Sequence, residues 1–175
     1  MLKAYETSGN YLFGEKEKFP KWLSWLMILP VAIVAGLMVK LPSLEEADRK
    51  EMWIALAIVL PLQVILFIAF QKARLEKVVT SNGLYFRWLP LQKKFRVIEK
   101  EMISSVSVSR APLLNYGSNW VPGYGRMHMA SKGEGVEVIK TDGKKIFFST
   151  ADPHSMARAL EELIRSNSKT RIREF

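Results

Sequence analysis

The sequence predicts a membrane helical hairpin followed by an α+β domain, in which about seven antiparallel strands form a small barrel capped by one C-terminal amphipathic helix. Three observations lead to this fold class. Two long uncharged runs precede residue 72, and the spacing of apolar residues becomes strand-like after residue 75. A helical spacing then returns after residue 152.

The first elements are two runs of membrane-spanning length. Residues 22–39 form an uncharged run of 18 residues, and residues 52–71 form a second run of 20. As helices they are about 27 and 30 Å long, close to the hydrocarbon thickness of a bilayer. Each run is apolar around its whole circumference, whereas a core helix of a small protein carries a polar stripe. We therefore expect two transmembrane helices, joined by a short extracytoplasmic loop at residues 40–51.

Three residues within these runs are candidates for helix packing. Ala32 and Gly36 lie four residues apart, so they would offer a flat face to the second helix or to a partner. Gln63 is the strongly polar side chain of the runs, and we interpret it as a partner in an interhelical hydrogen bond rather than as part of a transport path.

The flanking charges predict the orientation in the membrane. The N-terminal segment, residues 1–21, contains four Lys, and the twenty residues after the second run contain four Lys or Arg. The loop at residues 40–51 contains three. Because Lys and Arg concentrate on the cytoplasmic side, we expect both termini in the cytoplasm.

The strand-like region, residues 75–165, opens with a hairpin signal. Ser81-Asn82-Gly83 lies between the apolar runs 75–80 and 84–88, and Asn-Gly between such runs is typical of a tight turn. Further strands are expected at residues 94–98, 103–109, 127–131, 135–140 and 144–149. These segments together would make the barrel.

The last regular element is a helix. Asp152 can cap its N-terminus, and Pro153 suits the first helical position. Apolar residues including Met156, Leu160 and Leu163 then fall on one face, so this helix is expected to pack against the sheet. Residues 166–175 form a polar, basic tail.

A set of short motifs resembles a known family. The motifs are Glu15-Lys-Glu-Lys-Phe19-Pro-Lys-Trp22, Asn82-Gly83-Leu84-Tyr85-Phe86, Tyr116-Gly117-Ser118-Asn119-Trp120, Gly123-Tyr124-Gly125-Arg126, Gly133-Glu134-Gly135-Val136-Glu137-Val138, Asp142-Gly143-Lys144-Lys145 and Thr150-Ala151-Asp152-Pro153. In this order they resemble bacterial integral membrane proteins with two spans and a cytoplasmic pleckstrin-homology-like (PH-like) domain. The resemblance implies a PH-like barrel and a location in the bacterial inner membrane. That family has no established biochemical function, so the resemblance implies no catalytic residue.

The composition favours a protein that is not an enzyme. The chain has no Cys, which excludes disulfides, thiolate metal sites and thiol nucleophiles, and its two His are too few for a multi-His metal site. The glycine pairs at 123/125 and 133/135 lack the rest of a phosphate-binding or dinucleotide motif. We expect no cofactor and no metal. A nucleic-acid partner is not expected either, because the basic residues behind the net charge of +9 are dispersed and match no nucleic-acid-binding motif.

Two surface regions are candidate sites. The first is the loop from Arg110 to Arg126, which is long and rich in Gly, Pro and aromatic residues. Its rings, Tyr116, Trp120 and Tyr124, suit a protein interface or the headgroup depth of a membrane. The alternative is that these rings fold back and plug one end of the barrel.

The second region is a basic face that would either contact anionic lipid or only reflect the positive charge usual on the cytoplasmic side and ordinary solubility. Near a cytoplasmic leaflet each Lys or Arg contributes on the order of 1 kcal/mol to such contact. The residues of this face are Lys93, Lys94, Arg96, Lys144 and Lys145.

These observations lead to two functional hypotheses. The first is a non-catalytic membrane-anchored scaffold that presents its PH-like module to a protein partner, either a second copy or a larger membrane complex. The alternative is a sensor of anionic lipid or of a small ligand, which would use the basic face.

Overall fold

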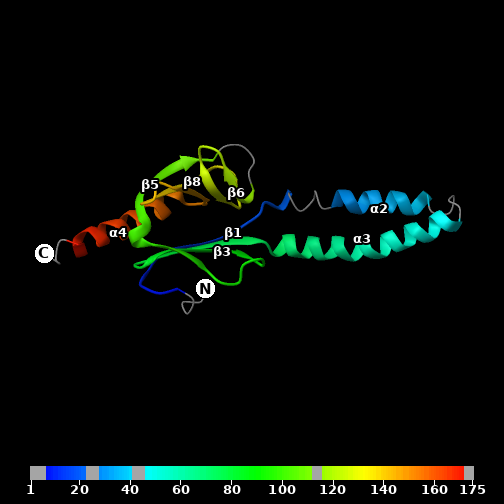
Figure 1. Cartoon of the computed structure of the whole chain (residues 1–175), viewed down its shortest axis with the longest axis horizontal. Helices are drawn as coiled ribbons and strands as arrows, with labels where there is room; N and C mark the ends of the chain where they lie inside the picture. Colours follow the sequence, from blue (N-terminus) through cyan, green and yellow to red (C-terminus); the bar gives the residue numbers. More distant parts are fainter. Residues whose placement is uncertain (1–6, 23–27, 41–45, 112–115, 172–175) are drawn as a thin grey trace. The chain divides into compact units, whose positions relative to one another are not determined.

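The computed structural model describes residues 7–22, 28–40, 46–111 and 116–171. The chain divides into two compact units. The β unit comprises the residues up to Phe19 together with those from Arg74 onward, and the helical unit comprises Pro20–Ala73. Figure 1 shows the elements of both units.

The helical unit contains α2 (Ile28–Lys40) and α3 (Glu46–Lys72), which run alongside each other in Figure 1. Their contact is made by Val34 and Leu56, which are buried, with Met52 and Leu60 packed against them. The contact therefore uses large apolar side chains.

The small residues predicted to pack the helices lie elsewhere. Ala32 and Gly36 are exposed, and a Cβ at Gly36 would meet nothing within 4 Å. Gln63 is half-buried on α3.

The prediction of two membrane-spanning helices is wrong for the described residues. Among them one helix is long and apolar enough to cross a membrane, Arg49–Lys72, and only 6% of its most apolar window is buried in the protein. As described, α2 has 13 residues, which make a helix of about 20 Å against a hydrocarbon core of about 30 Å. Part of the first uncharged run, residues 23–27, lies outside the described residues.

The β unit is built from two sheets. The first has the strand order β1-β2-β3-β4, and the second has the order β5-β8-β9-β7-β6. The strands of the first sheet are β1 (Tyr11–Lys18), β2 (Arg74–Thr80), β3 (Gly83–Leu89) and β4 (Arg96–Glu99). The strands of the second sheet are β5 (Ile103–Arg110), β6 (Gly117–Val121), β7 (Gly125–Met129), β8 (Glu134–Lys140) and β9 (Lys145–Ser149).

The predicted barrel of about seven antiparallel strands is also wrong. The described residues form nine strands in two separate sheets, and β7 pairs with β9 in parallel. The prediction missed β1, whose second half alternates Glu and Lys, because its polar faces hide the apolar pattern of a half-buried strand. It also missed β6, which lies inside the segment predicted to be a loop.

The helical unit is an insertion between two paired strands. β1 and β2 are antiparallel, and Lys18 at the end of β1 lies opposite Arg74 at the start of β2. The chain therefore leaves the β unit after Phe19 and returns to it at a neighbouring position.

The apolar core of the β unit lies between the sheets and α4 (Pro153–Arg171). It joins residues from both sheets, such as Phe86 and Phe148, to Met156, Leu160 and Leu163 of the helix. The helix predicted at the C-terminus is present, and Figure 1 shows it against the sheet that contains β5 and β8. As expected of an N-cap, Asp152 Oδ1 accepts a hydrogen bond of 3.0 Å from the N–H of Ser155.

A buried charged cluster adds to this core. Lys77 is fully buried on β2, and its Nζ lies 2.9 Å from Glu15 Oε2 and 3.0 Å from Glu17 Oε2. Glu17 accepts a 2.8 Å hydrogen bond from Ser149 Oγ, and Lys77 donates to the carbonyl oxygen of Ser149 at the end of β9. A buried charge is tolerated only with such partners, so the cluster ties β1 and β2 of the first sheet to β9 of the second.

The same cluster sets the ionisation of Glu15. Burial acts to raise its pKa, but the Lys77 ammonium and hydrogen bonds from Thr150 and from the N–H of Ala151 outweigh burial. The pKa of Glu15 therefore lies below its ordinary value of 4.5.

Candidate functional site

The parallel pairing of β7 with β9 brings two hairpin turns together. Arg126 on β7 lies opposite Ile146 on β9, and the two strands are parallel, so both begin at the same end of the sheet. Each strand is the second arm of a hairpin, because β6 pairs with β7 and β8 with β9, both antiparallel. The turn before Gly125 and the turn before Lys145 therefore lie at the same end of the sheet.

Gly125 permits this close approach. Its φ is +74°, in the region that side-chain-bearing residues rarely adopt, and a Cβ there would overlap the carbonyl oxygen of Lys145.

A pocket of about 420 Å³ lies between the two turns, and we call it the basic pocket. Its lining combines four cationic side chains with one aromatic ring and one aliphatic side chain. The lining residues are Trp120, Gly125, Arg126, Lys140, Lys144, Lys145 and Ile146.

The cations of the basic pocket outnumber the carboxylates that pair with them. Asp142 Oδ2 lies 3.1 Å from Nζ of both Lys140 and Lys144, and Lys145 Nζ lies 3.4 Å from Glu137 Oε1. Arg126 has no carboxylate partner among the residues that the structure describes. Four positive and two negative formal charges leave a local excess of two positive charges.

Asp142 stays ionised in this environment. The N–H of Lys144 donates to its Oδ1 at 3.1 Å, and together with the side chains of Lys140 and Lys144 it lowers the pKa of Asp142 to about 2. A carboxylate that bonds the N–H two residues on is typical of a turn. Asp142 therefore shapes the turn and holds two lysines at the pocket at neutral pH.

The three aromatic residues of the predicted loop have different surroundings. Trp120 on β6 is 70% exposed. Tyr116 is half-buried, and its ring meets Phe19 edge-on with 6.1 Å between centroids. Tyr124 is half-buried as well and packs against a cluster that includes Phe147. Trp120 is thus the ring of this segment that is offered to solvent, and it borders the basic pocket.

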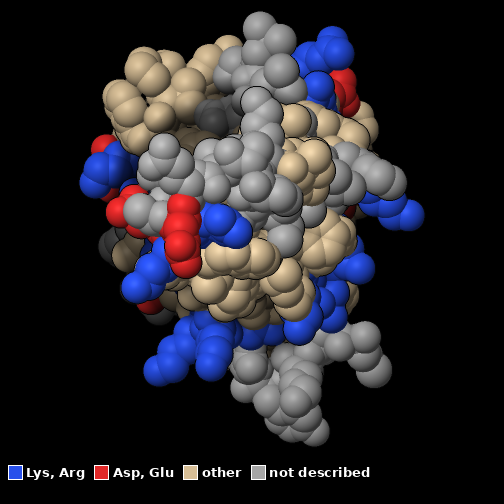
Figure 2. All heavy atoms as spheres, turned by 90° about the vertical axis from the view of Figure 1, so that its right-hand side faces the viewer, with Lys and Arg blue, Asp and Glu red and all other residues tan. Residues whose placement is uncertain are grey.

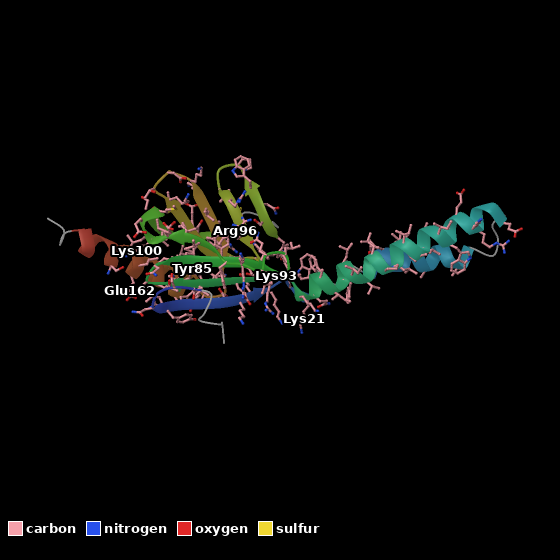
Figure 3. All side chains as sticks on the ribbon, turned by 60° about the horizontal axis from the view of Figure 1, so that its bottom comes forward. Lys21, Tyr85, Lys93, Arg96, Lys100 and Glu162 are labelled. Atoms are coloured by element: carbon pink, nitrogen blue, oxygen red, sulfur yellow. The ribbon has the colours of Figure 1, made fainter. Side chains whose placement is uncertain are left out.

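The predicted basic face is divided between the two sheets. Lys144 and Lys145 line the basic pocket, whereas Lys93 and Lys94 are exposed between β3 and β4, and Arg96 is exposed at the start of β4. Figure 3 shows Lys93, Arg96 and Lys100 spread along the β unit rather than gathered at one point.

Of the two arginines that bound the predicted loop, one reaches the pocket. Arg126 lines it, while Arg110 is exposed at the end of β5, and residues 112–115 that follow it lie outside the described residues. Lys140 was not among the predicted site residues, because the sequence predicts it only as the last residue of a strand. Nothing in the sequence shows that the end of this strand lies beside the start of β7.

A buried histidine lies on the same strand as Arg126. His128 Nδ1 accepts a 3.1 Å hydrogen bond from the indole N–H of Trp88, and its ring stacks on Phe148 with 5.2 Å between centroids. Burial, and then the positive charges of Arg126 and Arg96, lower the pKa of His128 to about 4. The imidazole is therefore neutral at pH 7 and joins the two sheets, since Trp88 belongs to β3.

The described residues contain no group of three or more His, Cys, Asp or Glu side chains that could hold a metal ion. No protein-family model, no curated protein and no solved structure matches this chain. Fold and site together define a two-sheet β unit with an inserted apolar helical unit and a basic pocket at one sheet end.

Proposed function

We propose that this chain is a non-catalytic, membrane-associated binding protein. Helix α3 inserts into a bilayer, and the β unit stays at the membrane surface and offers the basic pocket to a ligand. The observation that carries this proposal is the exposed apolar surface of α3, where Ile58 and Ile65 are 64% and 62% exposed. An exposed apolar surface of this extent indicates contact with lipid or with another protein.

The ends of α3 support insertion into lipid. Arg49 and Lys50 precede its apolar stretch, Trp53 follows them, and Lys72 ends the helix. Basic residues and Trp are enriched where an apolar helix meets the interface of a bilayer. From Arg49 to Lys72 the helix has 24 residues and is about 36 Å long.

The pairing of β1 with β2 supports a single location for the β unit. Because Lys18 and Arg74 are opposite each other, the chain enters and leaves the helical unit on the same side of the membrane. The net charge of +9 suits the cytoplasmic face, where anionic lipids attract Lys and Arg. On the face that Figure 2 shows, Lys and Arg cover more surface than Asp and Glu. We place the β unit at the cytoplasmic surface of a bacterial inner membrane.

Membrane extraction of the full-length chain tests this proposal. We expect the chain to stay with membranes after washes with high salt and with alkaline carbonate, since neither disrupts apolar insertion. The double variant Leu62→Arg/Ile65→Arg should be lost from the membrane fraction, because a charge at the centre of an inserted helix costs about 3 kcal/mol or more. The matched variant Ser104→Arg/Ser107→Arg, on exposed positions of β5, should behave like the unaltered chain. Release of the unaltered chain by the washes would contradict the proposal.

A protein partner is the second candidate for the ligand. The exposure of Trp120 favours it, because Trp is enriched in protein interfaces. Extraction in mild detergent followed by mass measurement distinguishes a protein ligand from a small or lipid ligand. A defined assembly that dissociates in the Trp120→Ala variant would favour a protein, whereas a lone chain would favour a small or lipid ligand.

A further inference from the structure

We propose that the basic pocket is a binding site for a negatively charged phosphate group. This inference deepens the proposed function, because it names the chemistry of the ligand that the β unit takes at the membrane. The phosphate is carried either by the headgroup of an anionic phospholipid or by a free phosphate in solution. The lipid source rests on the proposed function, and the free source does not.

The charge of the pocket is the first argument. The excess of two positive charges remains after Asp142 and Glu137 are counted, and Asp142 cannot neutralise itself by taking up a proton near pH 7 because its pKa is about 2. An anion is the ligand that complements this excess.

The hydrogen-bond donors are the second argument. Arg126 has no carboxylate partner among the described residues, so its guanidinium can approach two phosphate oxygens side by side. Each lysine has three N–H donors, and the ion pairs to Asp142 and Glu137 use only part of them. Phosphate has several oxygens to accept hydrogen bonds, and here donors approach from two separate turns.

The position of the donors is the third argument. Arg126 follows one turn and Lys144 and Lys145 end the other, and the parallel pairing of their strands holds both turns in place. The site therefore exists before a ligand arrives, which lowers the cost of binding. Basic residues scattered on independent loops would not have this property.

Trp120 and Ile146 favour a lipid as the carrier. Both line the pocket beside the cations, so an apolar surface borders the phosphate position. Trp is enriched at the depth of lipid headgroups, because its ring is apolar and its N–H can donate a hydrogen bond there. The apolar α3 of the same chain would keep the β unit near such headgroups.

The test uses the full-length chain in nanodiscs of zwitterionic phosphatidylcholine. One arm adds inorganic phosphate, with sodium chloride of equal ionic strength as reference, and the other arm replaces part of the lipid by phosphatidylglycerol. The signal is the fluorescence of Trp120, obtained as the difference between the chain and its Trp120→Phe variant, since the chain has five Trp. We expect the Trp120 signal to change in at least one arm.

Two double variants assign the response to the pocket. Arg126→Gln/Lys145→Gln should weaken binding by about tenfold or more, since each removes a charge-assisted hydrogen bond. Arg158→Gln/Arg165→Gln removes the same charge from exposed positions of α4 and should bind as the unaltered chain does. A response to phosphatidylglycerol identifies the lipid as the source, and a response to inorganic phosphate alone identifies a free phosphate.

Two results would overturn the inference. One is a Trp120 signal that responds in neither arm, and the other is equal weakening by the two double variants, which would indicate general charge attraction. Size-exclusion chromatography of the same samples shows whether the chain enters the nanodisc at all. Failure to enter the nanodisc contradicts the proposed function. Entry without any change in Trp120 fluorescence contradicts the phosphate site alone.

Discussion

Single buried polar residues connect the two sheets of the β unit. Trp88 of one sheet donates to His128 of the other, and Lys77 holds Glu17 while donating to Ser149 at the end of β9. A hydrogen bond or ion pair has a defined geometry, so it sets how the two sheets face each other more narrowly than apolar contact does.

His128 makes the stability of the protein depend on pH. Its pKa is about 4 in the folded chain, against an ordinary value of 6.5. Below pH 6.5 His128 is protonated in the unfolded chain, whereas in the folded chain it stays neutral until near pH 4. The free energy of unfolding therefore falls as the pH falls through this range. The expected loss is about 3 kcal/mol between pH 7 and pH 4.

Two measurements check this prediction. Denaturant unfolding of the chain in detergent micelles at several pH values gives the loss of stability. NMR of the His128 side chain gives its pKa directly. Titration of His128 near pH 6.5 would show that the ring is not buried as described. Glu15, whose pKa is lowered from 4.5, also contributes to stability. That contribution is lost as the pH falls below 4.5, which is at lower pH than the loss from His128 begins.

Among the secondary-structure elements, the parallel pair β7 and β9 decides where the candidate site forms. The hairpin at Ser81-Asn82-Gly83 and the helix after Asp152 could be predicted because their signals are local. Parallel pairing has no local signal, since it joins two strands whose hairpin partners are other strands. Strand β1 was missed because half of its residues are charged, although Glu17 is buried.

Substitution of Gly125 tests the pairing at its closest point. Gly125→Ala should destabilise the chain by about 3 kcal/mol or more, because the new Cβ overlaps the backbone of Lys145 in addition to the cost of a positive φ. Gly123→Ala is the matched control: its φ is +81°, yet a Cβ there meets nothing within 4 Å, so it should cost only about 1 kcal/mol. Denaturant unfolding measures both. Equal losses would show that β7 and β9 do not approach at Gly125.

For the molecule as a whole, the insertion of the helical unit between β1 and β2 has a consequence for topology. The segment before the helical unit and the whole chain after it belong to one folded β unit. They must therefore lie on the same side of any membrane that the helical unit enters. This expectation depends on strand pairing and not on the distribution of Lys and Arg, so the orientation predicted from charge stays a separate prediction.

Cysteine labelling tests the common side. The chain has no native Cys, so single variants Asn10→Cys and Ser104→Cys introduce one thiol each at exposed positions before and after the helical unit. In sealed inner-membrane vesicles of known orientation, a membrane-impermeant maleimide should label both variants or neither. Labelling of one variant alone, with both labelled after detergent is added, would contradict the pairing of β1 with β2.

The sequence by itself determined the local properties of this protein. Its uncharged runs, turn glycines and helix cap act through neighbouring residues, and they indicate an apolar helical segment, a β-rich region and a C-terminal helix. Tertiary structure decided how many helices are long enough to cross a membrane, how the strands divide into two sheets, and where β1 pairs. These features depend on long-range pairing and burial. The same holds for the basic pocket. Trp120 and Arg126 belong to one hairpin and Lys145 to another, and only the parallel contact of β7 with β9 brings the two hairpins to one place.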